Sequence, residues 1–511
     1  MNDNIRDNGD HIAVVDYSSG GRYSFVDVGR SVHRAALHLQ QCGVRSGRHV
    51  VVTLPLGIDL VAYCHGALLL GAVPSFLDPN QPAEALAQCL ATLDPSVWVC
   101  RSRQVPENVY GGTLCVPGAV TRDIPVGIAD IPGRQWNTTD TVLLLYTSGT
   151  TGVPKGVPWT SRELASQIRY YRCEEITSEL CLFPHLALVA LAMGRRVVLP
   201  DLATLAPAHL DIATLYQQLT ESGSDYVFAS PLVWHRLIEH MSHHGLAPPR
   251  LRRVATAGSA IGSRLIETMQ RALAPTDVVI PYASTEALMP ITLIGADDHI
   301  HYSESGTWSG KGTPLGRAAP ETQVAIIEPD LDITSFDVAV HSLPPESPGE
   351  IIVTGTRVTH TYFHRPEAER ESKLTDTCTG EIWHRTGDYG YMDVEGRLWY
   401  LCRKKNVIDS HHGPLYPDAL EQMWNLVTGF PLSGVVYLED LDRIFYAFPD
   451  EQDPAAIDLE TMAILADRLR IPHPTPLQLY GPLPTDPRHN SKIDRAELQT
   501  MVTKLVDSEE L

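Results

Sequence analysis

Residues 143–158 read LLLYTSGTTGVPKGVP, in which an apolar run gives way to small and hydroxyl-bearing residues and then to one lysine. A strand that ends in such residues lets backbone N–H groups approach phosphate oxygens closely, and hydroxyl groups can donate to the same oxygens. The lysine does not directly follow the second glycine, so this is not a Walker A motif. The segment predicts a phosphate-binding loop formed by Thr147, Ser148, Gly149, Thr150, Thr151, Gly152 and Lys155.

Four further segments place polar side chains where strands or loops are expected: ATAGSA (255–260), YASTE (282–286), HRTGDYGYMD (384–393) and LPTDPRHNSKIDR (483–495). The carboxylate of Glu286 is the oxygen ligand that a hard cation prefers. A carboxylate such as that of Asp388 can accept two hydroxyl hydrogen bonds side by side. Lys492 offers a positive charge that could stabilise charge developing in a transition state.

Taken in order, these segments resemble the motifs of the adenylate-forming enzymes, which include acyl-CoA synthetases, the adenylation domains of peptide synthetases and firefly luciferase. The resemblance covers residues 22–498, nearly the whole chain. It implies ATP and Mg²⁺ as cofactors, and a carboxylic acid that is activated as its acyl-AMP with release of pyrophosphate. A small-molecule acid is therefore the expected partner.

The resemblance also implies a role for each matching residue. Glu286 and Thr147 would serve Mg²⁺, Thr285 would contact the α-phosphate, and Tyr282 would stack on adenine. Ala283 stands where the family has glycine, which adds one methyl group beside the nucleotide. The other implied residues are Gly258 and Ser259 beside adenine, Asp388 on the ribose hydroxyls, Arg403 on the ribose or a phosphate, and Lys492 as the catalytic lysine.

Two stretches of the chain depart from the general pattern of the family. In SHHGPLYPDALE (410–421), His412 replaces a glycine and Ala419 replaces a glutamate. In DPRHNSKI (486–493), Ser491 replaces the glycine before Lys492. This version resembles a narrower group, the ATP-dependent β-lactone synthetases. That resemblance implies a 3-hydroxy acid substrate whose own hydroxyl attacks the activated carbonyl, expels AMP and closes a four-membered lactone.

An internal nucleophile requires no second substrate, and well-oriented intramolecular reactions reach effective molarities on the order of 10⁵ M or more. The hydroxyl proton needs a base. His185, His489 and Asp388 are candidates by residue type. The alternative function is an acyl- or aryl-CoA ligase, or a stand-alone adenylation enzyme, that passes the acyl group to a thiol. A third reading, a non-catalytic nucleotide-binding relative, is disfavoured because the implied catalytic and binding residues are all present, namely Lys492, Glu286, Asp388 and Arg403.

The acyl substrate is expected to lie against three segments that mix small, aromatic and aliphatic residues. The expected lining residues are Phe183, His185, Leu186, Phe228, Trp234, Ala257 and Met289. This mixture fits a long alkyl chain as well as a short branched acid. The identity of the acid therefore stays open at this stage.

Alternating strand and helix patterns must position these residues. Residues 24–43 repeat apolar side chains at helical spacing and stop at Gly43, while residues 49–55 form a β-branched run. The alternation recurs through residues 225–284 and predicts parallel sheets covered by helices. Residues 322–329 and 349–355 look like antiparallel strands, and Glu395-Gly396 is a hairpin turn signal.

The expected fold class is α/β. A large N-terminal domain (1–402) of parallel-rich sheets with a small β-barrel-like subdomain would bind ATP and the acyl substrate. A hinge (403–406), with Lys405 at the family's hinge position, would connect it to a small mobile α+β domain (407–511) that carries the catalytic lysine. The small domain would rotate between the two half-reactions.

The bulk composition limits the classes of function. Of the 511 residues, 61 are acidic and 40 are basic, which gives a net charge of −21 and argues against nucleic acid as a partner. Nine cysteines are scattered without CxxC spacing, so no zinc knuckle or redox motif is indicated. The polar start and the lack of a long apolar run predict a cytoplasmic protein without membrane insertion.

Overall fold

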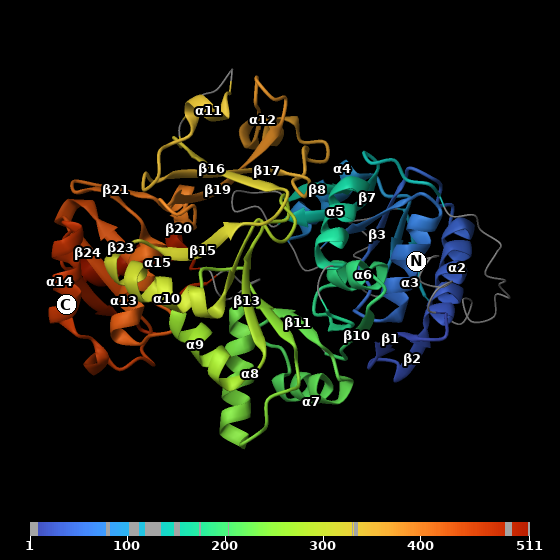
Figure 1. Ribbon diagram of the computed structural model, residues 1–511, viewed down its shortest axis with the longest axis horizontal. Helices are drawn as coiled ribbons and strands as arrows, with labels where there is room; N and C mark the ends of the chain where they lie inside the picture. The colour runs from blue at the N-terminus through green and yellow to red at the C-terminus, as the bar shows by residue number, and fades with distance from the viewer. Residues whose placement is uncertain are drawn as a thin grey trace.

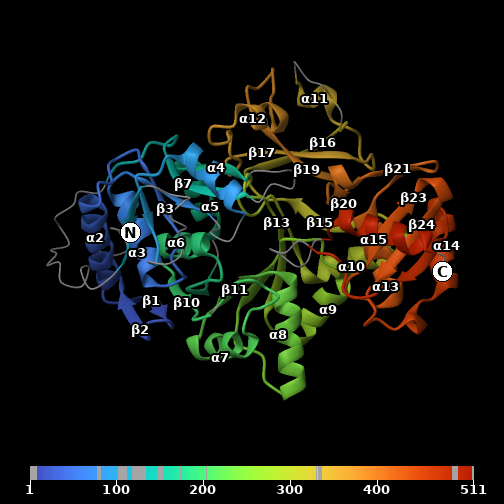
Figure 2. The same cartoon turned by 180° about the vertical axis from the view of Figure 1, so that it is seen from behind.

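A computed structural model of the chain describes residues 9–77, 82–101, 112–117, 134–147, 154–172, 175–202, 204–329, 331, 336–485 and 493–508. A six-stranded sheet lies toward one side of Figure 1, a larger sheet extends through the middle, and a small C-terminal unit lies at the opposite side. The reverse view in Figure 2 shows the same order from behind.

The smaller of the two main sheets is parallel except for its last pair of strands, β7 and β8. Its order is β6 (Thr113–Cys115), β5 (Val97–Val99), β3 (His49–Val52), β4 (Val73–Phe76), β7 (Thr141–Thr147) and β8 (Lys155–Thr160). The middle of β7 (Val142–Leu145) and most of β3 are buried, as expected for strands that are covered on both faces.

The larger sheet has 14 strands among the described residues. Its order is β16 (Thr322–Ile327), β17 (Gly349–Gly355), β19 (Ile382–Met392), β20 (Leu398–Arg403), β15 (Thr313–Ala318), β14 (Thr292–Gly295), β13 (Asp277–Tyr282), β12 (Arg253–Thr256), β11 (Tyr226–Ala229), β9 (Ser178–Leu180), β10 (Arg196–Leu199), β1 (Ile12–Asp16) and β2 (Gly21–Ser24), with β18 (Lys373–Thr375) paired to β19. The strands from β1 to β13 pair in parallel, and those from β13 to β16 pair antiparallel.

Helices cover these sheets. They are α2 (Phe25–Gln41), α3 (Ile58–Leu69), α4 (Ala83–Leu93), α5 (Ser161–Arg172), α6 (Pro184–Ala192), α7 (Ile212–Ser222), α8 (Pro231–His244), α9 (Ser263–Ala272), α10 (Ala296–Gly306), α11 (Val338–His341) and α12 (Pro366–Ser372), with the short 3₁₀ helix η2 (Thr307–Ser309). Apolar side chains of α7, α8 and α9 pack on β11, β12 and β13. Those of α2, α3 and α6 pack on β1 and β10.

The C-terminal part begins after β20 with the 3₁₀ helix η3 (Lys404–Asn406). Its elements are β21 (Ile408–Ser410), β22 (Gly413–Leu415), α13 (Pro417–Thr428), β23 (Gly434–Leu438), η4 (Glu439–Leu441), β24 (Arg443–Phe448), η5 (Pro454–Ala456), α14 (Leu459–Leu469), β25 (Pro474–Gln478) and α15 (Arg495–Asp507). β23, β24 and β25 form a separate sheet with its own apolar core.

The predicted α/β architecture is confirmed, and so are several individual elements. Ser24 and Asp27 form a capping box at the start of α2, which ends at the predicted stop before Gly43. The turn at Glu395-Gly396 joins β19 to β20, with Gly396 N–H donating to Asp393 O at 3.0 Å. The antiparallel strands expected as a small subdomain are hydrogen-bonded into the larger sheet through β14 and β15.

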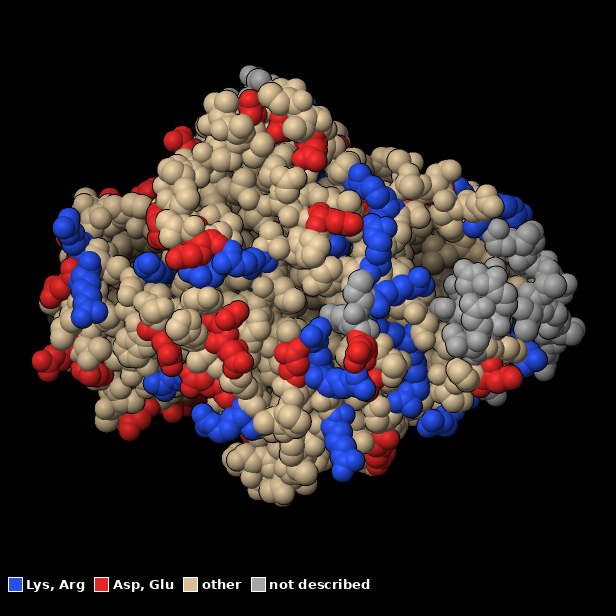
Figure 3. All heavy atoms as spheres, viewed as in Figure 1, with Lys and Arg blue, Asp and Glu red and all other residues tan. Residues whose placement is uncertain are grey.

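Charged side chains of both signs are scattered over the face seen in Figure 3, with basic ones gathered over the region of α5, α6 and β10. None of the described helices combines the length and the apolar character that a bilayer crossing requires. The proposed domain boundary at residues 403–406 stays a prediction.

Gly316 allows β15 to pass close to β14. Its φ is +80°, and an added Cβ would clash with the carbonyl oxygen of Leu293. We expect Gly316→Ala to lower the free energy of unfolding by more than Gly20→Ala. Both changes put a side chain at positive φ, at a strain of about 1–3 kcal/mol, but Gly20 has open space around it. Urea unfolding of both variants measures the difference, and equal losses would contradict the clash.

Candidate active site

Three strands of the larger sheet bring together the residues predicted to hold the nucleoside. Tyr282 ends β13, Asp388 lies within β19, and Arg403 ends β20. Tyr282 Oη donates to Asp388 Oδ2 at 2.5 Å, and Arg403 Nη1 lies 2.9 Å from Asp388 Oδ1. Asp388 faces Arg403 directly across the β19–β20 pair, so the hairpin register sets this ion pair.

Asp388 shifts the pKa values of both of its partners. The carboxylate of Asp388 raises the pKa of the Arg403 guanidinium, and burial together with Asp388 raises the pKa of the Tyr282 hydroxyl. Tyr282 therefore stays a hydrogen-bond donor at neutral pH. A carboxylate has about four lone-pair positions, so a group such as Asp388 can accept more than one hydroxyl donor.

Glu286, the predicted Mg²⁺ ligand, is held in place by a neighbouring segment of the chain. Tyr362 Oη donates to Glu286 Oε1 at 2.8 Å, and the backbone N–H of Thr359 donates to the Glu286 carbonyl at 2.8 Å. We find no hydrogen bond to Glu286 Oε2 among the residues that the structure describes. The carboxylate is thus oriented, and one of its oxygens is available to a cation.

Two ammonium groups flank the ring of Tyr362. The Nζ of Lys155 lies 5.4 Å from the ring centroid and the Nζ of Lys373 lies 5.5 Å from it. Lys373 Nζ also donates to the Thr359 carbonyl at 2.5 Å. Burial lowers the pKa of Lys373 to about 8, although the carboxylate of Glu286 opposes this shift. The phosphate lysine of β8 and the cation ligand of the β13 loop are therefore linked through one tyrosine.

The remaining nucleotide residues divide between the described and the undescribed parts of the chain. Thr147 and Lys155 face each other across the β7–β8 pair, so they form the base of the predicted loop. Thr285 accepts a hydrogen bond from Trp159 Nε1 at its carbonyl, at 2.9 Å. Gly258 and Ser259 lie in the loop after β12, and Ala283 follows β13. The residues outside the description are Ser148, Gly149, Thr150, Thr151, Gly152, His489 and Lys492.

Part of the predicted acyl pocket forms an aromatic cluster. The ring of Phe183 lies 5.4 Å from that of Phe228 and 6.0 Å from that of His185. The ring of His185 packs edge-on against Trp159 at 5.6 Å. Burial lowers the pKa of His185 to about 4, so its ring is neutral at pH 7 and is a weak proton acceptor. The cluster suits a wall better than a base.

The other predicted pocket residues lie deeper or apart. Trp234 is 1% exposed in the core beneath α8, and its Nε1 donates to the Ala255 carbonyl at 3.2 Å. Leu186 and Met289 line a cavity of about 20 Å³ next to the buried pair of Arg195 and Glu179. That volume holds about one water molecule. Ala257 lies in the loop after β12, and the pocket role of all these residues stays a prediction.

The predicted hinge residue, Lys405, is exposed within η3. On its C-terminal side, Asp418 of α13 accepts a hydrogen bond from Tyr400 Oη at 2.7 Å, and Arg495 pairs with Asp418 and Glu421. Arg264 of α9 donates to the Leu426 carbonyl at 2.6 Å. These contacts dock the C-terminal part on β20 and α9.

The described residues on the two sides of the segment that holds the predicted catalytic lysine lie next to each other. Thr485 and Ile493 pair as an isolated antiparallel bridge, and Asp494 N–H donates to the Pro484 carbonyl at 2.9 Å. Asp494 then caps α15, whose first residue is Arg495. The described residues that follow this segment are therefore tied, through Arg495, to Asp418, which accepts from the Tyr400 hydroxyl.

Tyr362 and Lys373 are contacts of Glu286 that sequence reasoning did not single out. Both lie in the segment VTHTYFHRPEAERESK (358–373), which the family resemblance covered only as a whole. A buried lysine that follows a helix rich in glutamate offered no local signal. Only the packing of this segment against β8, where Phe363 N–H donates to the Gly156 carbonyl at 2.8 Å, brings it to the site.

Comparisons with known proteins identify the family. The sequence profile of the AMP-binding enzyme family matches residues 1–363. An olefin beta-lactone synthetase of Xanthomonas campestris pv. campestris is 28% identical, over 93% of this chain and 90% of that protein.

Two solved structures share the fold. The amide bond synthetase of Marinactinospora thermotolerans superposes with a TM-score of 0.79 at 21% identity, and the match covers 98% of each chain. The O-succinylbenzoate coenzyme A synthetase of Bacillus subtilis, solved with ATP and a magnesium ion, has a TM-score of 0.77 at 20% identity. That match covers 97% of this chain and 98% of the other.

The lowered pKa of Lys373 predicts a pH-dependent difference in stability. Between pH 8 and about 10.4, the ordinary pKa of lysine, the unfolded chain binds this proton and the folded chain does not, so the stability that Lys373 contributes rises with pH by up to about 1.4 kcal/mol per unit. We expect the wild type to gain stability over Lys373→Met from pH 8 to pH 10 in urea unfolding. Parallel pH profiles would contradict a depressed pKa.

Proposed function

Because this chain belongs to the AMP-binding enzyme family, we propose that it is an ATP-dependent β-lactone synthetase. Adenylate-forming ligase activity is the part that the family establishes. The finer proposal is that a 3-hydroxy carboxylic acid is activated as its acyl-AMP and that its own hydroxyl then closes the ring. One observation carries this proposal: the similarity to an olefin beta-lactone synthetase over 93% of the chain.

In the first half-reaction, a carboxylate oxygen of the acid attacks the α-phosphorus of ATP and pyrophosphate leaves. Asp388 would accept the ribose hydroxyls, and Arg403 and Tyr282 would hold its carboxylate in place. Lys155 and Thr147 would serve the departing phosphates. Mg²⁺, when bound with ATP, neutralises the charge of the leaving group, and the carboxylate of Glu286 fits such a hard cation.

In the second half-reaction, the 3-hydroxyl oxygen attacks the acyl carbonyl carbon, the bond to AMP breaks, and the hydroxyl proton passes to a base. AMP leaves and the β-lactone forms. Closure must compete with hydrolysis of the acyl-AMP, so water has to be excluded. The aromatic cluster of Phe183, His185 and Phe228 offers a water-poor wall for this step. Lys492 would stabilise charge in the first step, and His489 is the proposed proton acceptor.

The C-terminal part lends further support to a reaction without a thiol. Ala419, where many relatives of the thiol-using type carry glutamate, is 2% exposed and packs with Tyr391, Trp399 and Leu401. A carboxylate could not enter this apolar cluster without losing solvation. His412 lies in the turn between β21 and β22, and its Nε2 is 3.1 Å from the carboxylate of Asp442. This contact ties the turn to the neighbouring β23–β24 hairpin. We keep Lys405 as the proposed hinge of this part.

The product distinguishes a lactone synthetase from a ligase. The protein is incubated with ATP, Mg²⁺ and a panel of 3-hydroxy acids of increasing chain length. We expect mass spectrometry to detect a product that is about 18 Da lighter than the acid, because the intramolecular ring closure removes one water overall. We expect AMP in equal amount and no change on adding coenzyme A.

Two controls complete this experiment. The matching acids without the 3-hydroxyl should be adenylated without giving a lactone. A Lys492→Ala protein should release almost no pyrophosphate. Product formation that depends strictly on coenzyme A would establish the ligase function instead.

The proposed ribose contact can be tested through ATP binding. We expect Asp388→Asn to weaken binding of a non-hydrolysable ATP analogue by at least about tenfold, because charge-assisted hydrogen bonds contribute roughly 1.5–3 kcal/mol. Tyr282→Phe, which keeps the ring and the carboxylate, should weaken it less. Isothermal titration calorimetry measures both. Unchanged affinity in Asp388→Asn would refute the proposed role.

A further inference from the structure

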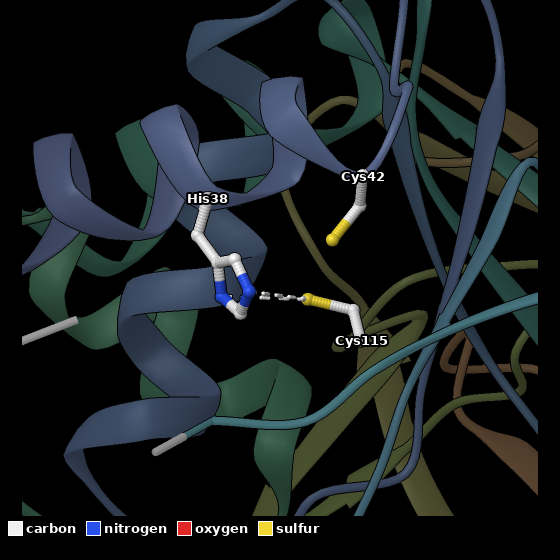
Figure 4. A group of neighbouring side chains, drawn as sticks. All are labelled: His38, Cys42 and Cys115. Atoms are coloured by element: carbon white, nitrogen blue, oxygen red, sulfur yellow. Dashed lines mark hydrogen bonds between the residues drawn. The ribbon is translucent and has the colours of Figure 1, made fainter. Parts of the chain in front are cut away.

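A histidine and two cysteines meet at the edge of the smaller sheet, far along the fold from Glu286 and Asp388. His38 lies in the last turn of α2, Cys42 caps that helix, and Cys115 ends the edge strand β6. One ligand atom from each residue lies within 4.8 Å of the others. Figure 4 shows the three side chains pointing toward a common space between α2 and β6.

We propose that His38, Cys42 and Cys115 form a binding site for a thiophilic divalent cation, with Zn²⁺ as the expected ion. Zn²⁺ binds well to thiolate and imidazole ligands, whereas ions such as Mg²⁺ prefer carboxylate and other oxygen ligands. Nothing in the adenylation chemistry uses these residues, so the site is separate from the Mg²⁺ that accompanies ATP.

The distances lie close to those of such a site. With Zn–S near 2.3 Å and Zn–N near 2.0 Å, a tetrahedral site separates sulfur from nitrogen by about 3.5 Å. Cys115 Sγ lies 3.9 Å from His38 Nε2, so a small shift of the imidazole or of the cysteine would complete the geometry, and it lies 3.6 Å from His38 Nδ1. His38 and Cys42 are four residues apart, so one turn of helix presents both to the same side. The spacing of His38 and Cys42 is visible in the sequence, but the proximity of Cys115 is visible only in the fold.

A neighbouring hydroxyl fixes the imidazole. Tyr63 of α3, which is 2% exposed, has its Oη 2.6 Å from His38 Nδ1. Ligating histidines commonly donate their second ring nitrogen to such a partner, which sets the tautomer and the ring orientation. With Nδ1–H donating to Tyr63, His38 Nε2 is directed to the metal. Cys115 is 1% exposed, whereas His38 and Cys42 are half-buried and give the ion access.

The group holds three candidate ligands among the described residues, so an exchangeable water would complete a tetrahedral site. β6 is an edge strand paired only to β5. The backbone N–H of Cys100 donates to the Cys115 carbonyl at 3.1 Å, which holds the third ligand in place. Metal binding would therefore fasten the end of α2 to the edge of the sheet.

Cobalt substitution in the full-length protein tests the site directly. Reduced, metal-free protein is titrated with Co²⁺ in the absence of ATP, and we expect one equivalent to produce a thiolate-to-cobalt charge-transfer band that Zn²⁺ abolishes. The Cys42→Ser/Cys115→Ser double variant should lose the band. Tyr63→Phe should keep it with an affinity lowered by about 10–100-fold.

Cys378→Ser is the matched control, because Cys378 belongs to a different group with Asp337 and Asp376. This control should leave the band unchanged. The proposal is overturned if wild-type protein gives no charge-transfer band, if the band survives in the double variant, or if Cys378→Ser removes it. The wild-type titration decides even if a variant fails to fold, and pyrophosphate exchange activity reports folding of each variant.

Discussion

The carboxylate of Asp388 is only 6% exposed, and the need to give it partners organises the centre of the molecule. An ionised carboxylate in such a place needs a cation or several donors. The fold provides both, with Arg403 directly opposite in the β19–β20 pair and the Tyr282 hydroxyl from β13. Because β13, β14, β15, β20 and β19 are hydrogen-bonded in one sheet, their register determines this arrangement.

Glu286 follows the same logic with a different partner. Its orientation depends on Tyr362, and the ammonium groups of Lys155 and Lys373 both lie near the ring of Tyr362. The positive charges of the two lysines would attract phosphate groups. They would also offset the negative charge of the Glu286 carboxylate, the proposed ligand of Mg²⁺. The burial of Lys373 weakens one of these charges near pH 8, so the local field depends on pH in a range where enzymes work.

The sequence was most informative where chemistry coincides with a strand end or a turn. Asp388, Arg403 and Tyr282 each lie in or at the end of a strand whose pattern was readable, and the structure brings these three together. The contact of Tyr362 with Glu286 spans 76 residues, and no periodicity predicts it. The burial of Trp234 was not readable from its residue type either, because it depends on the packing of α8 in the core. The roles of Lys405 and Lys492 stay predictions.

The strand that precedes the proposed hinge lies in the interior of the larger sheet. β20 is paired on one side with β19 and on the other with β15, and it ends at Arg403. If the C-terminal part rotates, the hydrogen bonds of β20 to β19 and to β15 would resist any movement of the strand that carries Arg403. The rotation would therefore be confined to the few residues after Arg403. The proposed ribose contacts would keep their positions while the C-terminal part moves.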